Sequence, residues 1–416
     1  MDLGNKTALC FDRGLYSFLA QKLGESFGRV LYYMDCPSPY PESQRAQIGK
    51  GLPELEWIDD PWPHVDKADL LCFFDCNDGR MQHYFREKGY RVFGSGRSER
   101  LELDKAWFLE QVSAARLPVP HTYRAEGLED LERYLADAKG EKWLKTSYYR
   151  GDFETQKFRG MKHLRPWLSD LRQRIGERRA KEIEILVQSP IDAKCEAGYD
   201  GFCVDGEFTD NCLVGYEIKD KGLVAKVFEK PPEILARVND AMGPLFRKLG
   251  YRGHYSTEIR ITAEGKPYFI DPTCRAPSPP SELMCELYAN YAEAVWQIAG
   301  GEVPTLKPKA PYGAEIVLSS AWHESHELCV EFPRELAPFV KLKNQTRRQG
   351  THYIVPNGNG GIFGAVVAYG KTMDEATRKA LEYAEQIECA ELDYESSLFD
   401  QAAEQTKCGE AFGIPF

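Results

Sequence analysis

Short apolar runs alternate with helix-like stretches over the first hundred residues of the chain. Four runs have the length and the aromatic or β-branched content of buried strands: 7–11, 30–34, 69–74 and 91–93. Helical stretches are expected around 15–22 and 81–88. Strands that alternate with helices in this way predict a parallel sheet flanked by helices.

The pattern changes at two points further along. After Gly94-Ser-Gly96 a helix is expected that carries Lys105, and between Pro304 and Pro311 prolines and lysines indicate a linker. A chain of 416 residues is too long for one core. We therefore predict an α/β fold, α+β in part, with three domains. These are an N-terminal parallel-sheet domain at 1–95, a central domain at 96–308 with a lid subdomain at about 118–187, and a small C-terminal domain at 309–416.

Composition narrows the class of protein. A hydrophobic content of 43% is typical of a globular chain, and a net charge of −11 argues against a general nucleic-acid binder. The start of the chain lacks the apolar stretch of a signal peptide, and no apolar run is long enough to cross a membrane. Twelve cysteines occur without a Cys-x-x-Cys pair, which favours free thiols in a reducing compartment. We expect a cytoplasmic protein.

A predicted hairpin carries two acids. Strands at 254–261 and 266–272 are joined by a turn in which Gly265 can adopt a positive φ. If the turn centres on Glu264 and Gly265, Glu258 faces Asp271 across the hairpin. Opposed carboxylates repel, and a divalent cation such as Mg²⁺ removes that penalty because it prefers oxygen ligands. The alternative is a surface hairpin with solvated charges.

Strand alternation adds two groups to the face of Asp271. Thr273 and Arg275 follow it at intervals of two residues, so a hydroxyl and a guanidinium are expected beside the acid. The segment Asp271-Pro-Thr-Cys-Arg275 resembles the Glu-x-Asn-x-Arg strand of the ATP-grasp superfamily. The resemblance implies an ATP-grasp fold preceded by a pre-ATP-grasp domain. It also implies ATP and Mg²⁺ (or Mn²⁺) as cofactors, with metal ligands from Glu258, Asp271 and Thr273.

The same resemblance assigns roles to residues of the central domain. Lys105 and Lys145 would reach the ATP phosphates, and Arg150, in the loop that follows Lys145, would share the catalytic work with Lys145 and Arg275. The strand at 183–191 would lead into the hinge that binds adenine, through Gln188, Ser189 and Ile191. Glu196 would bind the ribose hydroxyls, since a carboxylate accepts strong hydrogen bonds from them.

The C-terminal region narrows the resemblance. A glycine turn and apolar strand at 360–370 precede a capping box, Thr372 to Glu375, for a helix over 375–387. This order resembles the last domain of the phosphoribosylamine–glycine ligase family and, more loosely, that of biotin carboxylase. The implied reaction joins a small-molecule carboxylate to an amine through an acyl phosphate, in a monomer or homodimer.

Two departures from that family fall on the side of the second substrate. The turn after the first strand has one glycine, Gly14, beside Arg13, and the segment after Arg275 reads Ala-Pro-Ser-Pro-Pro-Ser-Glu282. We therefore expect Arg13, Ser278, Ser281 and Glu282 to line a pocket for substrates other than phosphoribosylamine and glycine. The alternatives are an ATP-grasp carboxylase or phosphoryl-transfer enzyme, or a catalytically quiet nucleotide-binding regulator. His323 and His326 are expected at the surface.

Overall fold

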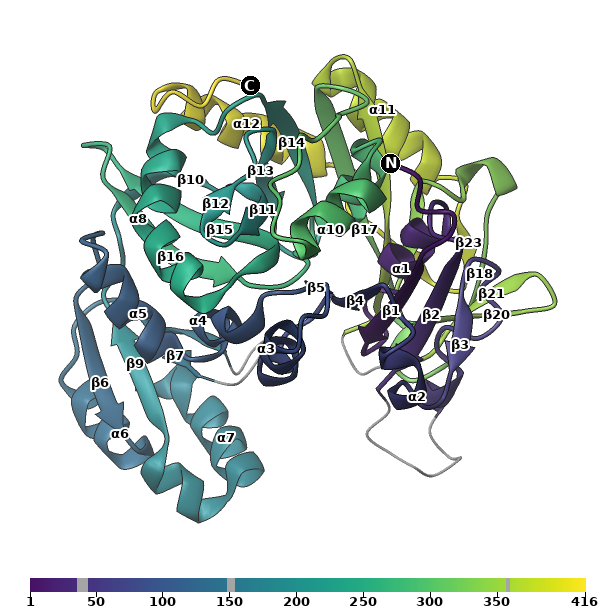
Figure 1. Cartoon of the computed structure of the whole chain (residues 1–416). Coiled ribbons are helices and arrows are strands. Elements are labelled where there is room, and N and C mark those ends of the chain that lie inside the picture. The colour runs from purple at the N-terminus through teal and green to yellow at the C-terminus, as the bar shows by residue number, and fades with distance from the viewer. Residues whose placement is uncertain (36–43, 148–153, 357–359) are drawn as a thin grey trace. The chain divides into compact units, whose positions relative to one another are not determined.

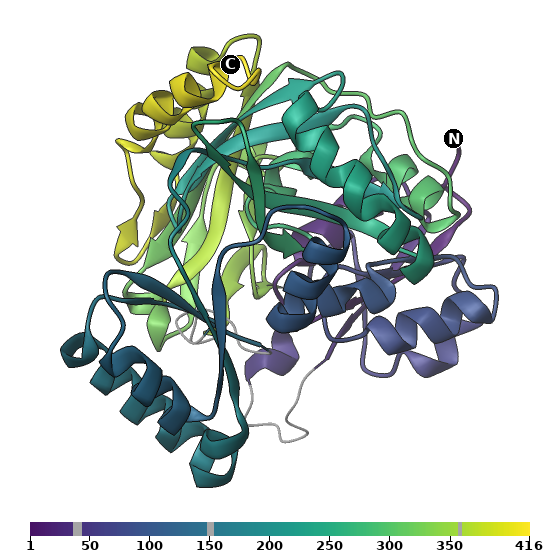
Figure 2. The same ribbon diagram turned by 90° about the vertical axis from the view of Figure 1, so that its left-hand side faces the viewer.

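The computed structural model describes residues 1–35, 44–147, 154–356 and 360–416. Its contacts divide the chain into two compact units. Unit 1 comprises residues 1–99, 197–258 and 273–416, and unit 2 comprises residues 100–196 and 259–272. Figures 1 and 2 show the ribbons from two sides. In the described residues no helix combines the length and apolar character that a membrane span needs.

Unit 1 begins with the predicted parallel sheet. Its strands lie in the order β3-β2-β1-β4-β5 and all pair in parallel. The elements of this region are β1 (Thr7–Asp12), α1 (Ser17–Gly24), β2 (Arg29–Met34), β3 (Glu56–Ile58), α2 (Trp62–Val65), β4 (Leu70–Phe73), α3 (Gly79–Glu87) and β5 (Val92–Phe93). β1, β2, β4 and β5 confirm the four predicted apolar runs, and β3 is an additional short strand.

The strand period of two gives this sheet two apolar faces. Leu9 and Phe11 of β1 pack in one buried cluster, whereas Ala8 and Cys10 pack in another. Phe11 stacks on Phe73 of β4, with the ring centroids 4.5 Å apart. Burial on both faces explains why these strands read as continuous apolar runs in the sequence.

The rest of unit 1 is built around an antiparallel sheet. Within it the strand order is β15-β11-β13-β14-β17-β22-β19. The sheet and its helices comprise β11 (Asp200–Val204), β12 (Glu207–Phe208), β13 (Cys212–Ile218), β14 (Gly222–Phe228), α8 (Glu233–Leu249), β15 (Arg252–Thr262), α9 (Ser281–Leu287), α10 (Tyr291–Ala299), β17 (Tyr312–Ser320), β19 (Val340–Leu342), β22 (Ile362–Gly370), α11 (Met373–Ala384), β24 (Leu392–Asp393) and α12 (Leu398–Glu410). A smaller sheet holds β18 (Leu328–Glu331), β20 (Gln345–Arg348), β21 (Thr351–Ile354) and β23 (Glu388–Cys389).

Unit 2 contains a four-stranded antiparallel sheet in the order β6-β9-β7-β8. Helices α6 and α7 contribute leucines to a single buried cluster with this sheet, so both cover one of its faces. The elements of unit 2 are α4 (Arg100–Leu103), α5 (Lys105–Ala114), β6 (Thr122–Glu126), α6 (Leu128–Ala136), β7 (Lys142–Thr146), β8 (Thr155–Phe158), α7 (Met161–Glu182), β9 (Glu184–Gln188) and β10 (Ala193–Ala197), with the ends of β15 and most of β16 (Pro267–Thr273).

The hairpin turn between β15 and β16 differs from the prediction by one residue. Gly265 has a φ of +72°, as expected, and its N–H donates to the Thr262 carbonyl. The Thr262 N–H in turn donates to the Lys266 carbonyl at 3.1 Å, so Thr262 faces Lys266 across a three-residue turn. The predicted register, centred on Glu264 and Gly265, is therefore wrong at the turn. A one-residue change of register moves side chains to the opposite face of a strand.

Two smaller predictions are also corrected. Thr372 does cap α11 by accepting from the Glu375 N–H, but the Glu375 carboxylate accepts from the Lys371 N–H at 2.8 Å instead of from the capping residue. His326 is exposed as expected, whereas His323 is buried beside Phe363, and its backbone N–H donates to Ser320 Oγ.

Candidate nucleotide site and second-substrate residues

Lys105 is the first residue of α5. The Asp104 carboxylate caps this helix by accepting from the Trp107 N–H, and the Lys105 N–H donates to Ser147 Oγ at 3.0 Å. Its ammonium group is buried and lies 2.7 Å from Asp271 Oδ1 and 2.5 Å from Glu154 Oε1. The backbone contacts fix the start of the helix, and the ion pairs fix the side chain.

Lys145 reaches the same carboxylate from another element. It lies on β7, its ammonium group pairs with Asp271 Oδ2, and it donates to the Ile270 carbonyl at 3.1 Å. Unit 2 therefore brings together three of the predicted residues, Lys105, Lys145 and Asp271. Arg150 lies outside the described residues.

In this cluster Asp271 and Lys105 stay charged in spite of their low exposure to solvent. Burial alone would raise the pKa of Asp271, but the charges and hydrogen bonds of Lys105 and Lys145 outweigh it and lower the pKa to about 2. Burial works against the charge of Lys105, yet Asp271 and Glu154 raise its pKa above the ordinary value. Asp271 and Lys105 are therefore both ionised at neutral pH. An entering polyanion could replace either carboxylate as the partner of the lysines.

The structure supports only part of the metal-binding prediction. Asp271 supplies two carboxylate oxygens, and Thr273 ends β16, but the described residues contain no cluster of three or more His, Cys, Asp or Glu side chains arranged for a metal. Glu258 is an exposed residue of β15. Hard oxygen donors suit Mg²⁺, which usually keeps several waters and binds through one or two carboxylates plus substrate phosphates. The Asp271 carboxylate suits such an ion, whereas the corrected turn register no longer places Glu258 opposite Asp271.

The predicted adenine hinge follows β9. Gln188 ends that strand and its side-chain amide lies 3.5 Å from Thr122 Oγ1. The Ser189 N–H donates to the His121 carbonyl, and the Ile191 carbonyl accepts from Ala193 N–H. The backbone from Gln188 to Ile191 is thus held from both sides in unit 2.

Glu196, the predicted ribose ligand, already has a partner. Its carboxylate accepts from Arg260 Nε at 2.9 Å, and the Arg260 guanidinium lies 5.8 Å from the ring centroid of Trp143. Arg260 and Trp143 were not among the residues predicted for this region. Half of the Glu196 side chain is exposed, so it remains accessible to a hydroxyl group.

Arg13 and Arg275 have partners within unit 1. Arg13 donates to both Asp78 oxygens, at 2.8 and 3.2 Å, and to the Cys76 carbonyl. Arg275 donates to Tyr16 Oη at 2.9 Å, and that hydroxyl donates to the Ala276 carbonyl. Arg13 therefore lies in an acidic setting, which its local sequence does not indicate.

Ser278, Ser281 and Glu282 form one polar cluster with a lysine. Lys343 donates to Ser278 Oγ at 2.6 Å and pairs with Glu282 at 3.3 Å, and both serine hydroxyls donate to the Glu282 carboxylate. Ser281 and Glu282 are fully buried at the start of α9. The three predicted residues do lie together. Lys343 was missed because nothing in the local sequence separates it from other lysines.

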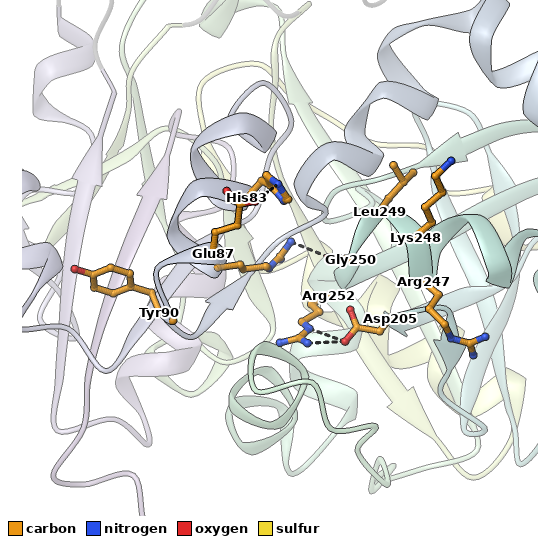
Figure 3. A pocket seen from close by; sticks show the side chains of 11 residues that line it. His83, Glu87, Tyr90, Asp205, Arg247, Lys248, Leu249, Gly250 and Arg252 are labelled. Carbon is orange, nitrogen blue, oxygen red and sulfur yellow. Dashed lines mark hydrogen bonds and ion pairs between the residues drawn. The ribbon is translucent and has the colours of Figure 1, made fainter.

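A cavity of about 420 Å³ in unit 1 has a different character (Figure 3). It lies where α3 and α8 end, and its lining includes Arg86, Arg247 and Arg252. Arg252 is held by both a 2.9 and a 2.6 Å contact to Asp205, and Arg86 donates to the Gly250 carbonyl. Basic groups near helix C-termini interact favourably with the helix dipole. The positions of these arginines are therefore explained by the fold, without a ligand.

Comparisons with known proteins agree on the fold. A scan against protein-family models finds no match, and no curated protein matches in sequence. Among solved structures, the phosphoribosylamine–glycine ligase of Thermotoga maritima matches with a TM-score of 0.70 and 15% identity, over 94% of this chain and 99% of that one.

Two further solved structures belong to other enzymes. The biotin carboxylase domain of the Hydrogenobacter thermophilus 2-oxoglutarate carboxylase, in complex with MgADP, ADP and bicarbonate, matches with a TM-score of 0.67 and 12% identity, over 96% of this chain and 98% of that one. The N5-carboxyaminoimidazole ribonucleotide synthetase of Thermotoga maritima matches with a TM-score of 0.59 and 14% identity, over 92% and 99%. Over most of its length the chain has the ATP-grasp fold that these proteins share.

Proposed function

We propose that the protein is an ATP-dependent carboxylate–amine ligase that forms an amide through an acyl phosphate. The observation that carries this proposal is the convergence of Lys105 and Lys145 on Asp271 inside an ATP-grasp fold. Two buried ammonium groups that share one carboxylate can stabilise phosphate charge when that carboxylate turns to another cation. Phosphoryl transfer depends on such positioning and charge stabilisation more than on covalent chemistry.

In this proposal each residue has a stated task. Lys105 and Lys145 bind the phosphates of ATP, while Asp271, with the Thr273 hydroxyl, would hold Mg²⁺. When bound, the metal neutralises phosphate charge. Arg275 and Arg150 stabilise the transferring phosphoryl group. The carboxylate substrate attacks the γ-phosphorus and releases ADP. The amine then attacks the acyl carbon, and phosphate leaves.

The nucleotide base and sugar have proposed sites in the same unit. The backbone of Gln188, Ser189 and Ile191 holds adenine, and Glu196 exchanges Arg260 for the ribose hydroxyls. Its half-exposed carboxylate supports this exchange, because an ion pair near the surface costs little to open. Ser278, Ser281 and Glu282, with Arg13, are proposed for the second-substrate side.

The test is ADP formation by the purified protein with a panel of carboxylates and amines. A ligase releases ADP only when a carboxylate is present, and hydroxylamine in place of the amine captures the acyl phosphate as a hydroxamate. ADP formation that needs bicarbonate and no other carboxylate would favour the carboxylase alternative, which the resemblance to biotin carboxylase domains also supports in fold. ATP binding without turnover on any substrate would favour a regulatory protein.

A further inference from the structure

The carboxyl ends of the parallel strands in unit 1 are rich in acids. Asp12 is the last residue of β1, Asp35 follows β2 directly, and Asp75 and Asp78 follow β4. In open α/β sheets ligands bind outside the carboxyl ends of the strands. We call this group of residues, with Arg13, Gly14 and Asn344, the carboxyl-edge site. Its strands and α1 are drawn in purple in Figure 1.

The helix N-termini at this edge are already supplied with carboxylates. Asp12 accepts hydrogen bonds from the Arg13 and Tyr16 N–H groups, at 2.7 and 3.0 Å, just before α1 begins. Glu99 accepts from the Asn77 and Gly79 N–H groups, at 2.7 and 2.9 Å, where α3 begins. A helix N-terminus binds phosphate through such N–H groups. Here the chain's own acids use them, and their charge opposes an incoming phosphate.

Arg13 does not reverse this balance. Its guanidinium makes a two-point contact with Asp78 and lies 3.6 Å from Asp35. One guanidinium is thus shared between two carboxylates. Burial works against the charge of Arg13, but Asp78, Asp75 and Asp35 together raise its pKa. The local field favours a cation over an anion.

A buried amide gives an independent indication of a ligand. The backbone N–H of Asn344 donates to the Gly14 carbonyl at 2.6 Å, and its side-chain oxygen lies 2.5 Å from the position that a Cβ on Gly14 would occupy. The Asn344 side chain is fully buried, and within the described residues neither its Oδ1 nor its Nδ2 has a hydrogen-bond partner. Buried amides are normally paired. This one faces the turn that joins β1 to α1.

We propose that the carboxyl-edge site binds the amine substrate, and that this substrate carries no phosphate. Its cationic ammonium form is attracted by Asp35 and Asp78, and the Asn344 side-chain amide accepts a hydrogen bond from its N–H. The inference rests on the proposed ligase function and names the class of its amine. Glycine at position 14 leaves room for this amide, because a Cβ there would lie 2.5 Å from Asn344 Oδ1.

The test is direct binding to the full chain without ATP, by calorimetry, with pairs of probes that differ only by a phosphate. Ethanolamine is compared with phosphoethanolamine, and serine with phosphoserine. The unphosphorylated member of each pair is expected to bind at least about tenfold more tightly, since one unfavourable or lost charged contact is worth that factor. Tighter or equal binding of the phosphorylated members overturns the proposal, as does binding of no probe.

Two variants sharpen this test. Asn344 has a φ of +50°, so Asn344→Gly removes the amide while suiting the backbone, and should weaken ethanolamine binding about tenfold. Asp78→Asn releases Arg13 and should narrow the preference against phosphate. Gln349→Gly, at an exposed residue with a φ of +52°, is the matched control and should bind as the unaltered protein does. Unchanged affinity in Asn344→Gly overturns the role of the amide.

ADP formation is measured on the same samples. Selective amine binding without ATP turnover contradicts the ligase function and leaves the amine site standing.

Discussion

The cluster around Asp271 in unit 2 and the carboxyl-edge site in unit 1 have opposite arrangements of charge. In the first, cations gather on an anion, and in the second, anions gather on a cation. Around Asp271, two lysines gather on one carboxylate, and their charge lowers its pKa to about 2 in spite of burial. At the carboxyl edge, Asp78 and Asp35 both pair with a single arginine, and Asp75 adds to the negative charge that acts on it. The first arrangement is prepared for a polyanion and the second for a cation. An enzyme that joins a phosphorylated carboxylate to an amine needs both.

The largest effect is expected from a substitution that disrupts the cluster around Asp271. Asp271→Asn removes the carboxylate that compensates Lys105 and Lys145, and should reduce the rate of ADP formation on the order of 10²–10³-fold. It should also destabilise the fold, on the order of 3 kcal/mol, because buried charges lose their partner. The hairpin interpretation, in which this acid repels another, predicts the opposite sign for stability. Urea unfolding decides between them, with Asp192→Asn, at an exposed aspartate of unit 2, as the control.

The lysine variants test whether the cations serve a nucleotide. Lys105→Met and Lys145→Met should each lower kcat/KM for ATP on the order of 10²-fold, since each removes a charge aimed at the phosphates. Lys157→Met is the matched control, because Lys157 lies on the neighbouring strand β8 and pairs with Glu141 at 2.9 Å. Equal losses in all three variants would show that the effect is structural and would remove the phosphate role.

A smaller effect is expected at the sugar. Glu196→Ala should raise the KM for ATP about tenfold with little change in kcat, as one charge-assisted hydrogen bond is lost in both ground and transition states. Arg260→Met removes the other half of the ion pair and should leave the KM near its original value. A KM that rises in Arg260→Met and not in Glu196→Ala would contradict the assignment.

Some features of these two regions could be predicted from the sequence and others could not, for a physical reason. The apolar runs of β1, β2 and β4 are local signals, and the order Lys105, Lys145, Asp271 could be compared with a known family. Glu154, Lys343, Arg260 and Asn344 could not be found, because their roles depend on partners far away in the chain. The register of the β15–β16 turn was missed for a smaller reason: one extra residue in a turn changes no hydrophobic pattern within it.

Acid titration tests one ionisable group in each unit, His254 in unit 1 and Asp271 in unit 2. Burial lowers the pKa of His254 to about 3, so below pH 6.5 the unfolded chain binds a proton that the folded chain excludes, and stability falls as the pH falls. The charge of Asp271, whose pKa is lowered, keeps its contribution until the pH drops below about 4 and loses it toward about 2. Between pH 6.5 and 4, His254→Gln should therefore flatten the fall in the free energy of unfolding by up to about 1.4 kcal/mol per pH unit. The same slope in both proteins would contradict this.

We propose that the protein uses ATP to join a carboxylate to an unphosphorylated amine. The most direct measurement is ADP formation with a panel of carboxylates and amines, run beside phosphoribosylamine with glycine. We predict ADP release that requires both a carboxylate and an amine without phosphate, and little turnover with phosphoribosylamine and glycine. Turnover of phosphoribosylamine and glycine at the usual enzyme scale of ~1–10³ s⁻¹ would contradict the account.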